Sequence, residues 1–245
     1  MNDPRISLGM YPAEVSSGIF TAIEHHLAAV LDEAGLHHGD QMVRHICGIT
    51  LATAPAGRWR YLATPVIGDP AVPQGHYNSL IITPRDGGLA KVGDFDPALH
   101  CAAINEPGSF SGTITLAAHL AETGGMKLTS PLLSGAHLDS VTMVAEGRAQ
   151  LAAIDRMSFA LAGHDRPDDV ARVRVIDETA FHPAPPLVAD GSLDDDVTAA
   201  LRAALLACPS LPAWPEMERL LGVTGMMVMD EALYPPMATV MLRAA

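Results

Sequence analysis

Apolar residues recur along the chain in two alternating patterns, short continuous runs and stripes with helical spacing. The first pair shows the arrangement, because Ile6–Met10 is an apolar run and the positions from Val15 to Leu31 then repeat every four residues. Ser16 or Ser17 is a suitable N-cap for that helix, and Gly35 can end it. Strand and helix alternate in this way to the end of the chain. The pattern predicts an α/β fold in which helices flank mixed, mostly parallel sheets.

The same pattern places further elements along the chain. Strands are predicted at Gln41–Ile46, Arg60–Ala63, Ser79–Thr83, His100–Ile104, Leu151–Ile154 and Val173–Ile176, and helices at Gly112–Glu122 and Leu138–Glu146. A later helix has an apolar stripe from Val197 to Leu205, with Ser192 as its candidate N-cap. The acidic run Asp194–Asp196 suits the positive end of that helix dipole.

Two segments interrupt the alternation and predict a chain that passes twice between two lobes. The composition changes at the turn Asp86-Gly87-Gly88, and three prolines force the segment His182–Val188 into an extended path that no helix can continue. We therefore expect lobe one to contain residues 1–83 and 186–245 and lobe two to contain residues 84–185.

Composition narrows the class of protein. Hydrophobic residues make up 49% of the 245 residues and aromatic residues 4%, which predicts a globular chain with an aliphatic core. The formal net charge of −13 argues against a nucleic-acid partner, since binding to a phosphate backbone needs clustered Lys and Arg. No run approaches the roughly 18 apolar residues of a membrane span, so membrane insertion is not expected.

The N-terminal residues and the metal-binding residue types add two further expectations. Met1–Arg5 lacks the cationic start and apolar stretch of a secretory signal, which predicts a cytoplasmic protein, or a periplasmic one if this is a mature form. Three widely spaced cysteines predict neither a disulfide framework nor a zinc site. The neighbours His25 and His26 would point about 100° apart on a helix, so we expect no metal and no cofactor.

The most informative stretch for chemistry is Cys101–Gly112, where an apolar strand runs into small polar residues and then a helix. Such a turn directs backbone N–H groups outward, and the hydroxyls of Ser109 and Ser111 beside them would form a cradle for a small anion. An ordinary helix N-cap explains the same serines, and this segment alone leaves both interpretations open. The turn is not a nucleophile elbow, because Phe110 stands where that motif needs Ser.

Two further segments place polar residues at the ends of predicted elements. His137 follows the small-residue turn Ser134-Gly135-Ala136 and lies near a helix start, where its ring N–H can donate to an anion. Asp155 follows an apolar strand, at the end where open α/β sheets bind ligands. Each of these residues alone has an ordinary structural explanation.

Taken together, these segments resemble the phosphate, phosphite and phosphonate solute-binding proteins of ABC transporters, which have the type II periplasmic-binding-protein fold. That family carries Asn-Asp-x-x-Ser-x-Ser-Gly, then Gly-x-His, then Gly-x-x-Asp-x-Ala-x-x-Asp. The matching stretches here are Asn105–Gly112, Gly135–His137 and Gly147–Asp155, with the same order and spacing. Parts of the first lobe are similar too, at Cys47-Gly48, Ala63-Thr64-Pro65 and Tyr77-x-Ser79, so the resemblance covers most of the chain.

The resemblance implies a ligand, a partner and a set of contacts. It implies a solute-binding protein that closes two lobes over a small anion of the phosphate or phosphonate type, with an ABC permease as partner. Tyr11 and Tyr77 become candidate ligand contacts from the first lobe. The full predicted ligand-binding set is Tyr11, Tyr77, Ser109, Phe110, Ser111, Gly112, His137 and Asp155, with no catalytic residue. Glu106, Phe110 and Gln150 depart from the family pattern, which bears on ligand identity more than on the fold.

Two alternatives use the same fold. A small cytosolic lyase would fit the missing leader, with Ser109, His137 and Asp155 as its polar residues. No set of nucleophile, base and orienting group is legible in the sequence, so we expect a binding protein rather than an enzyme. A cytosolic sensor would instead pass the ligand state to a partner through lobe closure.

Overall fold

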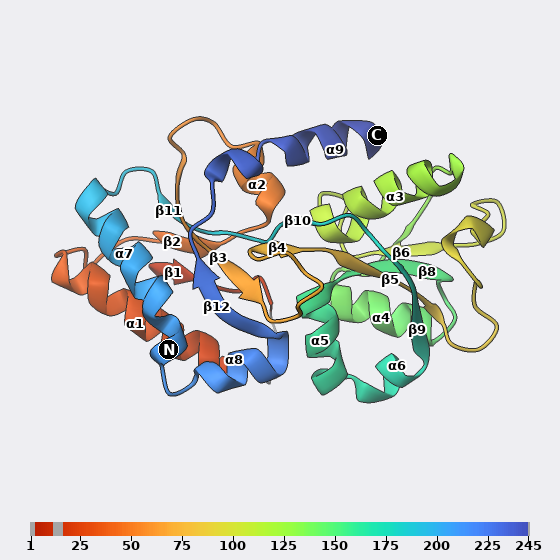
Figure 1. The fold of residues 1–245 in the computed structure, drawn as a ribbon, viewed down its shortest axis with the longest axis horizontal. Coiled ribbons are helices and arrows are strands. Elements are labelled where there is room, and N and C mark those ends of the chain that lie inside the picture. Colours follow the sequence, from red (N-terminus) through yellow and green to blue (C-terminus); the bar gives the residue numbers. More distant parts are fainter. Residues whose placement is uncertain (1–2, 12–16, 245) are drawn as a thin grey trace. The chain divides into compact units, whose positions relative to one another are not determined.

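The structure is a computed structural model that describes residues 3–11 and 17–244. Its internal contacts divide the chain into two units (Figure 1). Unit 1 contains the residues up to His76 together with Pro183–Pro236, and unit 2 contains Tyr77–His182 together with the residues from Met237 onward. Each unit is built around its own five-stranded sheet.

The sheet of unit 1 has the strand order β1-β2-β11-β3-β12. Its strands are β1 (Ile6–Ser7), β2 (Val43–His45), β3 (Trp59–Ile67), β11 (Leu187–Asp190) and β12 (Val223–Met227). β1 runs parallel to β2, whereas β11 is antiparallel to β2 and β3, and β12 is antiparallel to β3. The helices of this unit are α1 (Ser17–Glu33), α2 (Gly48–Ala52), α7 (Asp195–Ala207) and α8 (Trp214–Leu221), with short 3-10 turns at Cys208–Ser210 and Glu231–Leu233.

The sheet of unit 2 has the strand order β7-β6-β8-β5-β9. Its strands are β5 (Ser79–Pro84), β6 (Ala102–Ile104), β7 (Leu132–Leu133), β8 (Leu151–Asp155) and β9 (Val173–Glu178). β6 runs parallel to β7 and β8, whereas β5 is antiparallel to β8 and β9. The helical segments are a 3-10 turn at Val92–Asp94, a π-helix η3 (Phe110–Ile114), α3 (Thr115–Gly124), α4 (His137–Ala145), α5 (Arg156–Asp165) and α6 (Pro167–Ala171).

Two further elements lie where the chain passes between the units, and one lies at its C-terminal end. β4 (His76–Tyr77) and β10 (His182–Pro183) form a two-stranded sheet at the two passages. α9 (Pro236–Ala244) ends the described chain. Among the described residues, no single helix is long and apolar enough to cross a membrane; Asp195–Ser210 and Trp214–Leu221 meet that test only as a pair, which is bent by 80°.

Alternation along the strands of unit 2 explains how two helices come to lie on opposite faces of its sheet. Leu151 and Ala153 of β8 share a buried cluster with Leu116 of α3, whereas Ala152 and Ile154 share a second cluster with residues of α4. Successive side chains of a strand point to opposite faces, so one apolar strand anchors both helices. The starts of α3 and α4 are thereby fixed relative to the same strands.

The strand directions differ from the mostly parallel sheets that the sequence pattern predicts. Among the described residues, three of the four strand pairings in unit 1 and two of the four in unit 2 are antiparallel. Parallel pairing needs a long crossover connection, usually a helix. β11 instead enters its sheet directly from the extended proline-rich segment, so the periodicity of the preceding residues carries no information about its direction.

The passage between the units also differs from the predicted boundary. The prediction places Ser79–Thr83 in lobe one, but β5 pairs with β8 and β9 of unit 2. The turn at Asp86-Gly87-Gly88, which motivated the prediction, therefore lies inside unit 2. At the C-terminal end the prediction keeps all of residues 186–245 in lobe one, whereas the residues from Met237 onward group with unit 2.

The ends of α1 and α7 agree with the predicted caps in one case and differ in the other. Gly35 adopts a φ of 74° just after α1, and the Leu36 N–H donates to the Leu31 carbonyl at 2.8 Å, which is a common glycine-based helix end. Ser16 lies outside the described residues. Asp194 rather than Ser192 caps α7, since its carboxylate accepts from the Val197 N–H at 2.8 Å. Ser192 instead donates to Asp190.

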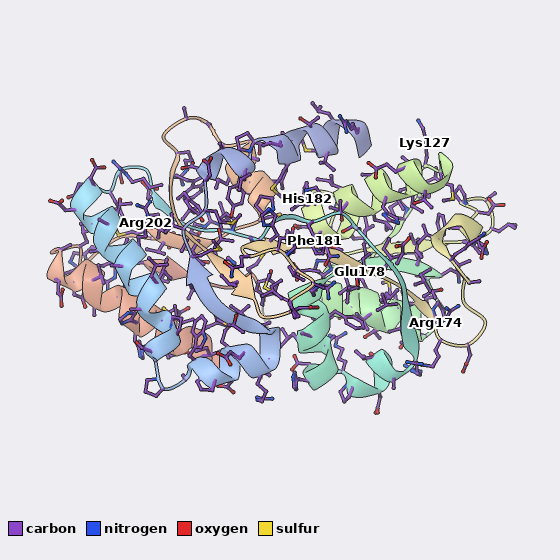
Figure 2. The ribbon with its side chains drawn as sticks, viewed as in Figure 1. Lys127, Arg174, Glu178, Phe181, His182 and Arg202 are labelled. Carbon is purple, nitrogen blue, oxygen red and sulfur yellow. The ribbon has the colours of Figure 1, made fainter. Side chains whose placement is uncertain are left out.

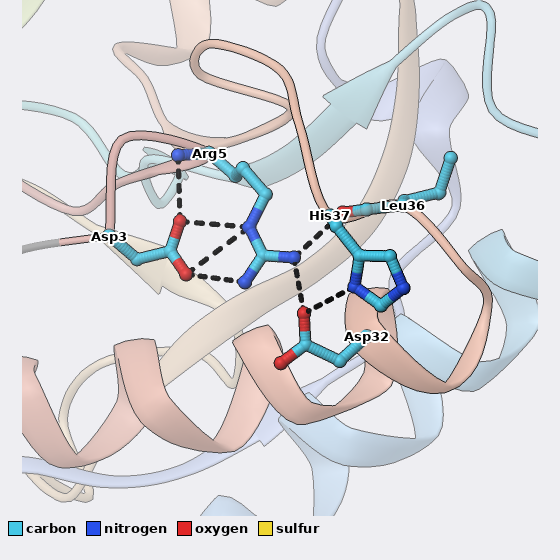
Figure 3. A network of polar contacts seen from close by, with 5 residues as sticks. All are labelled: Asp3, Arg5, Asp32, Leu36 and His37. Carbon is cyan, nitrogen blue, oxygen red and sulfur yellow. Dashed lines mark hydrogen bonds and ion pairs between the residues drawn. The ribbon is translucent and has the colours of Figure 1, made fainter.

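A buried arginine holds the N-terminal residues of unit 1 against the end of α1 (Figure 3). The Arg5 guanidinium donates to Asp3 at 2.5 Å, to Asp32 at 2.6 Å and to the Leu36 carbonyl at 2.7 Å. The hydrogen bonds from Arg5 hold the pKa of both carboxyl groups below the ordinary range. His37 lies 3.4 Å from the same Asp32 oxygen. This network ties β1 to α1.

Candidate functional site

The predicted serine turn forms the start of a helix in unit 2. Ser109 is the N-cap, with an extended backbone and a hydroxyl oxygen that accepts from the Gly112 N–H at 3.1 Å. The first turn after it is a π-helix, which α3 then continues. The first turn of a helix leaves N–H groups without intrahelical partners, at the positive end of the dipole. Among the described residues, the Gly112, Thr113 and Ile114 N–H groups already donate to Ser109, which leaves the Phe110 and Ser111 N–H groups as the backbone donors of the turn.

Ser111 and His137 come together at this helix start. The Ser111 hydroxyl oxygen lies 2.9 Å from Nε2 of His137, which is the first residue of α4. The carbonyl of Ser111 accepts hydrogen bonds from the Ser79 hydroxyl at 2.9 Å and from the Thr115 hydroxyl at 2.7 Å. β5, α3 and α4 thus fix the backbone and the side chain of one serine.

Gly112 lies where Asn105 and His137 approach the turn. An ideal Cβ at position 112 would lie 2.0 Å from Oδ1 of Asn105 and 3.1 Å from Cε1 of His137, so the two side chains occupy the space that a larger residue would need. Asn105 follows β6 directly, and its carbonyl accepts from the Gly135 N–H at 2.9 Å. Sequence reasoning did not include Asn105 among the site residues. The available signal was its place as the first residue of the matching motif.

Burial controls the protonation state of His137. Burial lowers the pKa of the His137 ring to about 4, and the backbone of Ala153 opposes this only in part. The ring is therefore neutral at physiological pH and has one N–H to donate. Among the described residues, the Ser111 hydroxyl is the side-chain group within hydrogen-bond distance of the ring, so no carboxylate orients His137 as in a catalytic triad.

Asp155 has a structural role that its position after a strand did not reveal. Its buried carboxylate accepts from the N–H groups of Met157 at 2.8 Å and Ser158 at 3.0 Å, which makes it the N-cap of α5. It pairs across the sheet with Ser79, the residue whose hydroxyl reaches the Ser111 carbonyl. Asp155 therefore supports the turn from the neighbouring strand pair.

The aromatic candidates lie in different places. The Phe110 ring is fully buried, and its edge-to-face contact with His182 has a centroid distance of 4.8 Å, so the ring packs inside unit 2 rather than facing solvent. Figure 2 labels His182 on the segment that leads out of β9. Tyr77 is buried at the first passage, in β4. Tyr11 belongs to unit 1, where its ring lies 5.5 Å from that of His45.

The structure thus brings four of the eight predicted residues into one group, namely Ser109, Ser111, Gly112 and His137. Phe110 lies next to them in the chain with its ring turned inward, and Asp155 is linked to them through Ser79. Within the part of the chain that the structure describes, no group of three or more His, Cys, Asp or Glu side chains is placed to hold a metal ion.

Comparison with known proteins gives one family match and several related folds. The profile of the family described as "ABC transporter, phosphonate, periplasmic substrate-binding protein" matches residues 48–234. PhnD1 from Prochlorococcus marinus, solved with methylphosphonate, is 12% identical with a TM-score of 0.74 and 97% of each chain covered. A phosphonate-transporter binding protein from Pseudomonas aeruginosa, PA3383, is 16% identical with a TM-score of 0.72, covering 98% of this chain and 85% of that one.

A third solved structure is similar over nearly its whole length. XAC2383 from Xanthomonas citri, bound to a chloride ion, is 17% identical with a TM-score of 0.70, covering 98% of this chain and 96% of that one. At these identities the likeness shows the fold alone. No curated protein matches the sequence.

Proposed function

We propose, from the premise that this chain belongs to the periplasmic substrate-binding proteins of phosphonate ABC transporters, that it binds a small phosphonate- or phosphate-type oxyanion at the start of α3. The observation that carries the proposal is the convergence at Gly112 of a helix start, the Ser111 hydroxyl and the neutral His137 ring. Helix starts and hydroxyls are the groups that proteins use to hold phosphate-like anions.

The acidic net charge is compatible with this ligand. A formal charge of −13 repels an anion at long range, but salt screens that repulsion beyond about 10 Å. Backbone N–H groups and hydroxyls act at hydrogen-bond distance, where screening is weak. A neutral His137 can donate through Nε2 to the Ser111 hydroxyl, which would then direct its own O–H at the anion without an added charge. Local hydrogen bonds rather than a basic patch would therefore hold the anion.

Solved relatives point to the same class of ligand. PhnD1 is described in complex with methylphosphonate, and XAC2383 is described with chloride and, in a second structure, with ATP. These ligands differ in size but share negative charge. Methylphosphonate is therefore the first probe to use, with phosphate and sulfate as tetrahedral comparators.

Membership of the family also supports a proposal about the partner. Proteins of this family serve ABC transporters with a small ligand. We propose an ABC permease as the partner of this chain, with delivery of the anion as its task. A lyase on the same fold has less support, because no carboxylate in the described part of the chain orients His137 as a base.

Binding measurements with matched variants test the proposal. We expect methylphosphonate or phosphate to raise the melting temperature and to give a saturable heat signal in calorimetry, since a ligand at 100 times its Kd stabilises the folded state by about 2.7 kcal/mol. Ser111→Ala should weaken binding by about tenfold or more, because it removes a hydroxyl donor at the helix start. Thr113→Val is the matched control, since that hydroxyl donates to the Glu106 carbonyl instead. Equal binding by both variants would contradict the assignment of the site.

A further inference from the structure

The side-chain oxygen of Asn105 is buried and has no hydrogen-bond partner among the described residues. Buried polar atoms without a partner are few in native proteins, and each one calls for an explanation. The oxygen lies against the π-helix η3 that precedes α3, 2.0 Å from the place that a Cβ at Gly112 would occupy. Ser109, Ser111 and His137 surround the same turn. An unpaired acceptor therefore lies beside the turn that the proposed function assigns to the anion.

The backbone holds Asn105 in this place from two sides. β6 pairs in parallel with β7, and just beyond this pairing the Ser134 N–H donates to the Ile104 carbonyl and the Gly135 N–H to the Asn105 carbonyl. The loop that carries these two donors leads directly to His137. An asparagine side chain has only two rotatable bonds, so a fixed backbone leaves the amide few positions. The amide is thus placed by the same loop that places the histidine.

The chemistry of the amide oxygen differs from that of its neighbours. The helix N–H groups, the Ser111 hydroxyl and the His137 ring can each donate a hydrogen bond, whereas an amide oxygen only accepts. A fully ionised tetrahedral anion such as sulfate carries acceptors alone and would meet the Asn105 oxygen acceptor to acceptor. A singly protonated phosphonate or hydrogen phosphate carries one acidic O–H that can donate to it.

We propose that Asn105 is a specificity-determining residue whose Oδ1 accepts a hydrogen bond from the acidic O–H of the ligand, so that the site selects singly protonated phosphonate-type anions over sulfate. The inference rests on the proposed function, since it assigns a further contact in the same site. A site that hydrogen-bonds a ligand hydroxyl discriminates strongly against an analogue without it, because the buried group of the protein is left unpaired. We expect sulfate to bind at least about 10-fold to 100-fold more weakly than methylphosphonate.

The expected pH dependence belongs to the ligand rather than to the site. His137 is the titratable group that α4 presents to the turn, and with a pKa of about 4 its ring stays neutral from mildly acidic pH upward. Asp155 at the end of β8 is committed to the N–H groups of α5, and Glu106 is exposed beside Asn105 in the chain. On α3, His119 pairs with Asp177 at 3.0 Å. The affinity for methylphosphonate should therefore fall as the ligand loses its last proton.

Two variants separate the acceptor role from its alternatives. Asn105→Asp keeps an acceptor at this place and removes the amide donors, whereas Asn105→Ala removes both. Glu106→Gln is the matched control, since it changes a neighbouring exposed side chain without touching Gly112. Circular dichroism and thermal melting check that each variant is folded before binding is measured.

Calorimetric titrations of methylphosphonate and sulfate, at one pH below and one above the last ionisation of methylphosphonate, test the inference. The wild type and Glu106→Gln should prefer singly protonated methylphosphonate, by about tenfold or more over both its ionised form and sulfate. Asn105→Ala should lose that preference without losing affinity for sulfate, and Asn105→Asp should keep the preference.

Three results would overturn the inference, and they have different meanings. Equal affinity of the wild type for methylphosphonate and sulfate, unchanged in Asn105→Ala, overturns the role of Asn105 while the proposed anion site stands. Weaker binding of both methylphosphonate and sulfate in Asn105→Ala and in Asn105→Asp shows that the amide donates rather than accepts. Failure of the wild type to bind methylphosphonate, phosphate or sulfate overturns the proposed function as well.

Discussion

Replacement of Gly112 by alanine is the most direct test of the arrangement at the start of α3. The new methyl group would lie 2.0 Å from Oδ1 of Asn105, 2.9 Å from its Cγ and 3.1 Å from Cε1 of His137. Carbon and oxygen atoms do not approach to 2.0 Å without a bond, so the Asn105 side chain must leave its position. Because glycine has no side chain, the substitution removes no wild-type contact and perturbs the site only through the added methyl group.

Two opposing effects set the change in the free energy of unfolding. Overpacking of a filled site destabilises a protein by about 1–3 kcal/mol. Alanine stabilises a helical position by roughly 1 kcal/mol over glycine, and the gain applies here because the φ of Gly112 is not in the left-handed region. The net loss should be about 0–2 kcal/mol. At about 2–4 °C per kcal/mol for a chain of this size, the melting temperature should fall by up to about 8 °C.

Ligand affinity should fall more clearly than stability. The displaced Asn105 side chain and the shifted His137 ring both belong to the proposed site, so we expect binding of methylphosphonate to weaken by at least about tenfold. Gly108→Ala is the matched control in the same loop, since an ideal Cβ there meets no atom within 4 Å. Thermal melting and calorimetry measure both quantities. Wild-type affinity and stability in Gly112→Ala would refute the crowding on which the site is built.

Two further predictions concern stability and pH. Burial lowers the pKa of His137 and of His45 to about 4, so below about pH 6.5 the folded state binds fewer protons than the unfolded state. The free energy of unfolding should therefore fall by roughly 1 kcal/mol per pH unit for each ring as the pH falls from about 6.5 toward 4. Urea unfolding at several pH values should show a shallower pH dependence in His137→Gln, and an unchanged pH dependence would contradict this. The hydrogen bond from Arg5 lowers the pKa of Asp3, so this pairing stabilises the protein above about pH 4 and is lost as the pH falls further. Asp3→Asn should lower the free energy of unfolding at neutral pH and make it depend less on pH below about pH 4. A pH dependence below about pH 4 identical to that of the wild type would count against this prediction.

The elements of the fold follow largely from local sequence, and the family resemblance is confirmed by the profile match. The strand before Asn105 and the helix after Ser111 could both be predicted from the sequence, because each is bounded by small polar residues. The solved relatives confirm the two-lobe α/β fold class. Strand direction could not be predicted. β11 enters its sheet antiparallel without a crossover helix, so no helical pattern before it indicates its direction.

The site was less predictable because tertiary contacts decide its details. The π-helical first turn has two hydroxyls on the Ser111 carbonyl, and one of them comes from Ser79 in a strand 32 positions away. The direction of the Phe110 ring depends on its edge-to-face contact with His182, which no local pattern describes. Asp155 was identified as a strand-end residue, but whether such a carboxylate meets a ligand or caps the next helix depends on hydrogen-bond geometry.

Asn105 and Gly112 form a coupled pair, and this coupling explains why a strand end and a helix start seven positions apart belong to one motif. The amide oxygen of Asn105 fills the space that a side chain at position 112 would need, so the cost of Gly112→Ala depends on Asn105. Contacting residues commonly show interaction energies of 0.5–3 kcal/mol in double-mutant cycles, about the size of the overpacking itself. In the Asn105→Ala background, Gly112→Ala should therefore no longer destabilise the protein. It should instead raise the free energy of unfolding slightly, through the helix preference of alanine. Additive changes in the free energy of unfolding would show that the two residues do not share that space.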